Sequence, residues 1–275
     1  MKKFFYNRTR KSRSIPERLI VERKFHLLPV YYLLQTSYLG AEAIENSGSY
    51  LLADHIYQDQ AQGKYGIGWL LDRLLLSLPS AKSFRNRYLF ARLHIRQHLV
   101  ETMNTNKSSR VLTVPAGIPR DVIEAVTEYR DKYSDYNQEI ICMDLDPQVL
   151  QIAQSYGKQH NVNLNLIETD ALTPHDWPKD IDLVTSTGLG EFLDNHQLQL
   201  FYHHIYKSLR QGGKFITSAI DRHALSDFLL TQIAEIHTQY RDAKLITDLI
   251  KPIGFSKLHI EVDSYGLNTH VIAIK

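Results

Sequence analysis

The sequence predicts an α/β protein with a doubly wound, mainly parallel, seven-stranded sheet, a C-terminal antiparallel hairpin and an all-helical N-terminal cap. Beyond residue 107, short apolar runs alternate with stretches of helical periodicity, which is typical of parallel strands joined by crossover helices. The last two runs, 257–262 and 270–274, are joined through a turn at Gly266, which favours a hairpin. After Pro16 the first segment is mostly helical in pattern. We therefore expect a helical extension over 1–106 and an α/β domain over 107–275.

The elements of the α/β domain follow from hydrophobic periodicity. Five strands are expected before the hairpin, at 111–114, 139–143, 164–168, 182–186 and 213–218. Helices are expected at 121–133, 149–156, 194–209, 225–234 and 245–250. In the N-terminal segment, helical patterns cover 27–43, 49–59 and 69–78, and a glycine-rich stretch at 63–68 is expected to be a hinge or a helix start.

Composition indicates a globular protein with few constraints on its partners. Of 275 residues, 43% are hydrophobic and 23% are charged, and the net charge of +2 favours no particular class of partner. The single cysteine, Cys142, lies in an expected core strand, so no disulfide framework is predicted. The apolar run at 25–34 is shorter than the ~20 residues needed to span a bilayer. We expect a cytoplasmic protein without a transmembrane segment; the oligomeric state is unknown.

Basic residues dominate two parts of the N-terminal segment. The first 24 residues are rich in Lys and Arg, which is compatible with binding to nucleic acid or anionic lipid but more often marks a solvated terminus. Between Asp72 and Glu101 no acidic residue occurs, and Arg85, Tyr88 and Arg92 share one helical face. This face either binds an acidic group of a substrate or is solvated. Tyr65 in the glycine-rich stretch is a further candidate for substrate contact.

The strand at 111–114 leads into the turn Pro-Ala-Gly-Ile-Pro and then into a helix. Such a strand–turn–helix unit directs free backbone N–H groups and the positive end of a helix at a ligand. Gly117 lacks a Cβ, so a ligand can approach its backbone closely. Pro119 suits the first turn of the helix, where a missing N–H costs nothing.

This unit resembles the first motif of class I S-adenosylmethionine (SAM)-dependent methyltransferases over roughly 108–275. In that family the motif is commonly a hydrophobic pair, an acidic residue and three alternating glycines. Here Thr113 replaces the acid, Pro115 and Pro119 replace the outer glycines, and only Gly117 is kept. The resemblance implies SAM as the cofactor, held in part by Pro115, Ala116 and Gly117.

Two acidic residues at the ends of later strands extend the resemblance. Asp144 follows the second strand, where the family places a carboxylate that accepts both ribose hydroxyls, and Leu145 would lie against the adenine. Asp146 is instead expected to cap the next helix. Asp170 follows the third strand, and the resemblance implies that it accepts from the adenine amino group while the backbone of Ala171 donates to the ring.

The end of the fourth strand faces the methyl group in this family. Thr185, Ser186 and Thr187 would line the floor of the site, and Thr187 is assigned to the cofactor. Glu191 is the ionisable side chain best placed to deprotonate an acceptor or hold its ammonium group; its alternative role is that of an acid at a helix N-terminus. The Leu-Arg-Gln-Gly-Gly turn at 209–213 supports the same fold.

Histidines supply the remaining candidates for acid–base chemistry. His223 follows the fifth strand, and His237 and Tyr240 are expected on one helix near the acceptor. Together with Glu191, the two histidines are the predicted catalytic residues, and Tyr240 joins Tyr65, Tyr88 and Arg92 as predicted substrate contacts. No spacing matches a metal motif, so no metal is expected.

The sequence thus favours a SAM-dependent methyltransferase for a small or medium organic acceptor with an apolar part. Three alternatives remain open: an enzyme that uses SAM by cyclisation or by transfer of its aminocarboxypropyl or aminopropyl arm, a nucleic-acid methyltransferase, and a non-catalytic binding module. The Asn/Asp-Pro-Pro-Tyr signature of amino-methylating nucleic-acid enzymes is absent at the end of the fourth strand, which counts against nucleic acid as a substrate.

Overall fold

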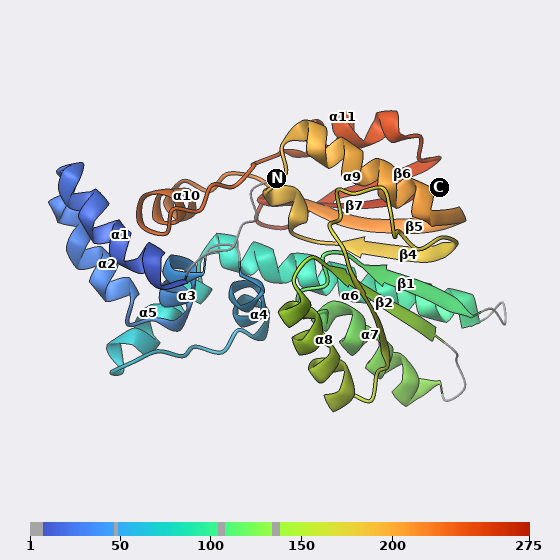
Figure 1. Ribbon diagram of the computed structural model, residues 1–275, viewed down its shortest axis with the longest axis horizontal. Coiled ribbons are helices and arrows are strands. Elements are labelled where there is room, and N and C mark those ends of the chain that lie inside the picture. Colours follow the sequence, from blue (N-terminus) through green and yellow to red (C-terminus); the bar gives the residue numbers. More distant parts are fainter. Residues whose placement is uncertain (1–7, 47–48, 104–107, 134–137) are drawn as a thin grey trace. The chain divides into compact units, whose positions relative to one another are not determined.

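A computed structural model describes residues 8–46, 49–103, 108–133 and 138–275 of the chain (Figure 1). The chain divides into two compact units, one formed by Met1–Arg85 with Arg222–Thr238 and the other by Asn86–Asp221 with Gln239–Lys275. Helix α6 (Pro79–Met103) belongs to both units because it runs across the point of division. The boundary predicted at 106–107 lies outside the described residues and stays a prediction.

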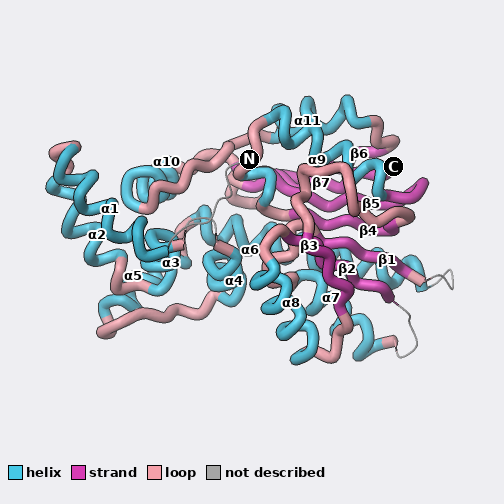
Figure 2. The backbone as a smooth tube through the Cα atoms, viewed as in Figure 1, coloured by secondary structure: helices cyan, strands magenta, loops and turns pink. Residues whose placement is uncertain are grey.

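A seven-stranded sheet forms the centre of the second unit, with its strands in the order β3-β2-β1-β4-β5-β7-β6 (Figure 2). The strands are β1 (Ser109–Thr113), β2 (Gln138–Asp144), β3 (Leu164–Glu168), β4 (Ile181–Ser186), β5 (Leu209–Ile220), β6 (Lys257–Val262) and β7 (Asn268–Ile274). The first five strands are mutually parallel, whereas β7 pairs antiparallel with both β5 and β6. The predicted fold class is confirmed.

Helices cover both faces of this sheet (Figure 1). One face packs against α6, α7 (Arg120–Lys132) and α8 (Pro147–Gln159), and the other against α9 (Asn195–Ser208) and α11 (Ala243–Ile250). Neighbouring residues of a strand alternate between the two cores, so Val111 lies in the first core and Leu112 in the second. Burial on both faces explains why the strands read as continuous apolar runs.

The other unit is helical. Its elements are α1 (Arg8–Val21), η1 (Phe25–Leu27), α2 (Leu28–Leu34), α3 (Tyr38–Glu45), α4 (Tyr50–Gln58), α5 (Ile67–Leu76), α10 (Ala224–Phe228) and the π-helical turn η3 (Leu229–Ile233). The segment Arg222–Thr238 belongs to this unit because its residues Ile233 and Ile236 share a core with Leu19 and Tyr31. Among the described residues, no helix combines the length and apolar character needed to cross a membrane. The expected cytoplasmic location stays a prediction.

Three boundaries differ from the sequence-based expectation. The helix expected over 27–43 is interrupted between α2 and α3, where Ser37 caps α3 and bonds to Asp72. Strand β5 begins at Leu209 and includes the expected Gly-Gly turn, with Gly212 at φ 75°. The prediction that His237 lies on a helix is wrong, because the chain is irregular after Glu235, whose φ is 53°.

Candidate active site

The turn after β1 is tied to the end of β2. The Ala116 N–H donates to the carbonyl of Met143 at 2.8 Å, and the Gly117 N–H donates to Oδ2 of Asp144 at 3.2 Å. Gly117 has φ 52°, a backbone conformation that glycine adopts without steric cost. Pro119 is the N-cap of α7. The order of strands reverses between β1 and β4, so this turn lies at the switch point where ligands bind in open α/β sheets.

Asp144 ends β2 with its carboxylate held by two backbone N–H groups. Besides the bond from Gly117, its Oδ1 accepts from the Asp146 N–H at 3.1 Å. Burial raises the pKa of Asp144, and these hydrogen bonds oppose the rise. The following Leu145 is 63% exposed, a high fraction for leucine. The prediction that Asp146 caps a helix is confirmed, because its side chain accepts from the Gln148 N–H at the start of α8.

The loop after β3 places Asp170 and Ala171 in a compact turn. Oδ1 of Asp170 accepts from the Leu172 N–H at 2.9 Å, and the Asp170 carbonyl accepts from the Thr173 N–H. Ala171 and Leu172 pack against the core that α9 and α11 share with the sheet. Thr187 follows β4 and is half-buried. The cofactor contacts assigned to Asp170, Ala171 and Thr187 stay predictions.

A buried ion pair lies beyond the end of β4. Glu191 closes the short helix η2 (Leu189–Glu191), and its carboxylate bonds to the guanidinium of Arg87 from α6. Arg87 is 2% exposed and Glu191 7%. Burial raises the pKa of Glu191, while Arg87 opposes the rise. The guanidinium also packs beside Gly188, since a Cβ there would lie 3.7 Å from Arg87 Nη2.

Arg241 fixes the loop that carries Glu191. Its side chain is 3% exposed and donates to the carbonyls of Gly190 and Leu193, each at 2.5 Å, and to Oδ1 of Asn195 at 2.9 Å. The Gln239 N–H donates to the Glu191 carbonyl at 2.7 Å. The segment containing Tyr240, a predicted substrate contact, therefore lies against the η2 loop.

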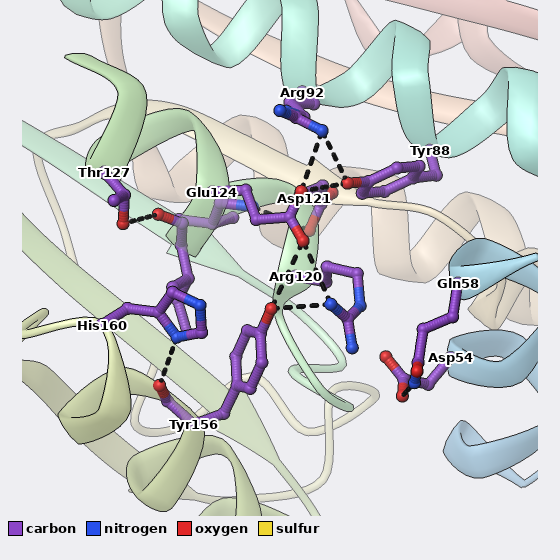
Figure 3. Close-up of polar contacts among 12 residues, drawn as sticks. Asp54, Gln58, Tyr88, Arg92, Arg120, Asp121, Glu124, Thr127, Tyr156 and His160 are labelled. Carbon is purple, nitrogen blue, oxygen red and sulfur yellow. Dashed lines mark hydrogen bonds and ion pairs between the residues drawn. The ribbon is translucent and has the colours of Figure 1, made fainter. Parts of the chain in front are cut away.

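The basic face predicted on α6 is matched by carboxylates of α7 (Figure 3). The Tyr88 hydroxyl donates to Glu124, and Arg92 forms ion pairs with Glu124, at 2.8 Å, and with Glu128. Arg120 adds a third contact to Glu124 at 3.1 Å. Desolvation and the bond to Glu124 raise the pKa of Tyr88. Substrate binding by Tyr88 and Arg92 stays a prediction, and in this structure both contact the protein's own carboxylates.

Three of the predicted residues belong to the helical unit rather than to the unit that contains the sheet. Tyr65 is 85% exposed at φ 57°, just before α5. His223 caps α10, with Nδ1 3.1 Å from the Ser226 hydroxyl. His237 is exposed. Their roles stay predictions, as does that of Glu191.

The structure adds two charged groups that the sequence did not single out. Arg87 is the first. Asp121, at the start of α7, is the second: burial raises its pKa to about 6, and the Arg87 charge opposes the rise. The acid-free run on α6 was the only sequence signal for Arg87, and it did not separate this arginine from its neighbours. Within the described part of the chain, no cluster of three or more His, Cys, Asp or Glu side chains is placed to hold a metal.

The family described as "Putative methyltransferase" matches residues 11–275. The chain belongs to this methyltransferase family. It is 26% identical over 261 residues to the uncharacterized protein YnbC of Escherichia coli (strain K12). The aligned region covers 86% of this chain and 42% of YnbC. The chain therefore spans less than half the length of that curated relative.

Solved structures share the fold. A possible exported protein from Bordetella parapertussis is 20% identical and superimposes with a TM-score of 0.79 over 98% of this chain and 95% of its own. The SAM-dependent methyltransferase SibL in its apo form is 12% identical, with a TM-score of 0.52 over 94% of this chain and 76% of its own. The comparisons confirm the predicted methyltransferase family and the predicted α/β fold.

Proposed function

We propose that the protein transfers the methyl group of SAM to a small or medium organic acceptor with an apolar part. The observation that carries the proposal is the bond between the Gly117 N–H and the Asp144 carboxylate at the switch point of the sheet. This bond holds the turn proposed to bind the ligand next to the acid proposed to bind the ribose. Membership of a methyltransferase family gives independent support.

The side chains beside the Gly117 turn have the chemistry needed to bind SAM. Each oxygen of the Asp144 carboxylate accepts one backbone N–H, and each has a further lone pair for a ribose hydroxyl. The exposed Leu145 offers an apolar surface next to it, as an adenine ring requires. When bound, SAM supplies a methyl group on a positively charged sulfur.

The chain's own residues then have separate tasks. Asp144 binds the ribose, the turn around Gly117 admits the cofactor close to the backbone, and Asp170 with Ala171 recognises the adenine. Glu191 acts on the acceptor, with its carboxylate positioned by Arg87. Such a site contributes mainly alignment and exclusion of water, because the leaving group is already activated.

Replacing Asp144 with alanine should weaken SAM binding by about 10- to 150-fold, because a hydrogen bond to a charged group contributes about 1.5–3 kcal/mol. Isothermal titration calorimetry measures the affinity. Asp146→Ala is the matched control: it removes a carboxylate two residues away and should cost about 1 kcal/mol of stability through the lost helix cap. Its SAM affinity should stay within about threefold of the wild-type value, a difference of less than one hydrogen bond.

Unchanged affinity in Asp144→Ala would contradict the ribose contact, and a wild-type protein that binds no SAM would contradict the whole proposal. Product analysis separates methyl transfer from other uses of SAM. Methyl transfer yields S-adenosylhomocysteine, whereas arm transfer or cyclisation yields methylthioadenosine.

A further inference from the structure

A row of polar side chains interrupts the apolar face of the sheet that packs on α6. Ile216 of β5 and Ile272 of β7 belong to this face, and because side chains alternate along a strand, so do Ser218, His270 and Asn268. Ser218 pairs directly with His270 across β5 and β7. Thr185 of β4 pairs with Ile216 and therefore points to the same face. We call Thr185, Ser218, Asn268 and His270 the polar row.

All four side chains are buried, with exposures of 2%, 5%, 1% and 3% in chain order. Within the described part of the protein, six of their polar atoms lack a hydrogen-bond partner: the two hydroxyl oxygens, both amide atoms of Asn268 and both ring nitrogens of His270. An unsatisfied buried polar group costs about 1–3 kcal/mol. Groups of this kind are almost always paired in folded proteins, so a cluster of them indicates a partner that the chain itself does not supply.

The polar row lies near the edge of the sheet at which the parallel strands end. Ser218 is near the carboxyl end of β5, and His270 is near the start of β7, so both lie at the edge of the sheet where parallel strands open onto a crevice. The η2 loop with Glu191 contacts β5 in the same unit. Phe90 of α6 stacks on the His270 ring at 4.4 Å with an interplanar angle of 26°, which fixes the orientation of the imidazole.

The surroundings keep His270 uncharged. Burial lowers its pKa, and the charged or titratable groups that face it are Asp263, Glu261, Arg87 and His94. The Asp263 carboxylate is already occupied, because it accepts from the Asn86 amide at 3.1 Å and from the Leu267 N–H at 2.9 Å. Arg87 is paired with Glu191. The polar row therefore presents hydrogen-bonding groups without an unmatched charge.

We propose that the polar row binds the hydroxyl group of an uncharged alcohol or phenol, and that His270 is the general base for its methylation. This inference rests on the proposed function. The acceptor O–H bond breaks and its proton passes to the unprotonated ring nitrogen of His270. The acceptor oxygen gains the methyl group, and the electron pair of the broken C–S bond stays on the donor sulfur.

A neutral hydroxyl suits these groups better than a charged acceptor. It can donate to a ring nitrogen of His270 and accept from Ser218, Thr185 or the Asn268 amide. A carboxylate or ammonium group would be buried there without a counter-charge, which is costly.

Phenol tests the inference, with anisole as a ligand of similar shape that cannot donate. Binding to the protein saturated with S-adenosylhomocysteine is measured from the side-chain resonances of labelled histidines. His270→Phe keeps the ring that stacks on Phe90 and removes both nitrogens. It should weaken phenol binding by about 3- to 10-fold, the effect of one hydrogen bond, and leave the weaker anisole binding unchanged.

His94→Phe is the matched control, since the His94 ring also contacts Phe90, with ring centroids 4.3 Å apart and an interplanar angle of 56°. It should leave phenol binding unchanged. In single-turnover reactions with SAM, His270→Phe should form anisole from phenol about 100- to 10,000-fold more slowly, as expected for loss of a general base. The His94→Phe rate should match the wild type.

Several results would overturn the inference. They are absence of phenol binding or of anisole formation in the wild type, and wild-type behaviour of His270→Phe in either assay. A rise in the thermal stability of His270→Phe with phenol binding intact would show that the row holds internal water only. If S-adenosylhomocysteine fails to bind the wild type, the proposed function fails; if it binds while the phenol assays fail, only the role of the polar row is wrong.

Discussion

Replacing Arg87 with methionine should lower the free energy of unfolding of the sheet-containing unit by about 3–5 kcal/mol at neutral pH, because it leaves a buried carboxylate without its counter-charge. Both partners of the Arg87–Glu191 pair are almost fully buried, so solvent screens neither charge effectively. Methionine retains much of the apolar stem of arginine, so the loss reports on the charge more than on packing. Denaturant unfolding followed by tryptophan fluorescence measures the change.

The pH dependence of this loss has a definite sign. Burial already raises the pKa of Glu191, and removal of Arg87 eliminates the influence that opposes the rise. A carboxyl group whose folded pKa lies above its unfolded value favours folding when protonated. Its contribution is fully present below the unfolded pKa, about 4.3, and is lost as the pH rises through the folded pKa. The deficit of Arg87→Met should therefore grow between pH 5 and pH 8.

The double variant Arg87→Met with Glu191→Leu is the matched control. Replacing a whole buried ion pair by apolar side chains is often nearly neutral for stability, so the double variant should recover most of the loss and its pH dependence. If single and double variants are equally destabilised, then packing and not the unpaired charge accounts for the effect. Turnover should be lost in both, since both lack the pairing that positions Glu191.

The parallel sheet and the helix cap at Asp146 could be predicted because their causes are local. Alternation of apolar runs and helical periods requires crossover connections, which fix a parallel sheet. Asp146 precedes Pro147 and an apolar helical period, a combination that predicts an N-cap without reference to the rest of the chain. Asp144 could be placed beside Gly117 because both follow strands that are neighbours in this fold.

The polar core of the site could not be predicted because its contacts are long-range. Arg87 and Glu191 are separated by 104 residues. Several other arginines lie near Arg87 in the sequence, and nothing in the sequence distinguishes Arg87 from them as the partner of Glu191. The pairing depends on how α6 packs on the sheet. His270 and Asn268 did leave a signal, because two polar residues alternate along a strand that is otherwise buried. The hairpin pattern alone does not assign them a role.

Helical periodicity gave a wrong prediction in two segments, 27–43 and 235–241. The interruption between α2 and α3 occurs at Ser37, whose hydroxyl accepts from the Gly40 N–H and donates to the distant Asp72. The sequence pattern also predicts a helix at 235–241, but Glu235 has a positive φ, which is incompatible with a continuous α-helix. In both segments tertiary contacts outweigh local propensity, which differs between residues by only about 1 kcal/mol or less.

Replacing Asp72 with asparagine should destabilise the helical unit by about 3–5 kcal/mol, since Asp72 is a fully buried carboxylate that organises four donors. Its oxygens lie 2.6 Å from the Ser37 hydroxyl, 2.7 Å from the Leu39 N–H, 2.7 Å from His55 Nε2 and 2.9 Å from the Gln62 N–H. An asparagine amide has one acceptor oxygen, so at least one pair of these donors would face an NH₂ group.

The pH dependence again follows from the direction of the shift. Burial favours the protonated form of Asp72, but the bonds from His55, Ser37 and two backbone N–H groups together outweigh it and lower the pKa. The stabilisation is therefore present above the unfolded pKa, about 3.9, and lost as the pH falls through the folded pKa. Asp72→Asn should remove this acid-dependent component of unfolding, measured by circular dichroism between pH 2 and pH 7. Glu17→Gln, the same chemical change on an exposed side chain of this unit, should leave it intact.

The same pair of variants tests what the helical unit contributes to function. The residues proposed to bind SAM all belong to the other unit, so Asp72→Asn should keep its SAM affinity even where its helical unit is loosened. If the predicted cap role holds, turnover falls in Asp72→Asn at temperatures where only the helical unit has melted, and Glu17→Gln behaves as the wild type. Full turnover by an Asp72→Asn protein with a melted helical unit would refute the cap role. Loss of SAM affinity in parallel with melting would show that the two units do not unfold separately.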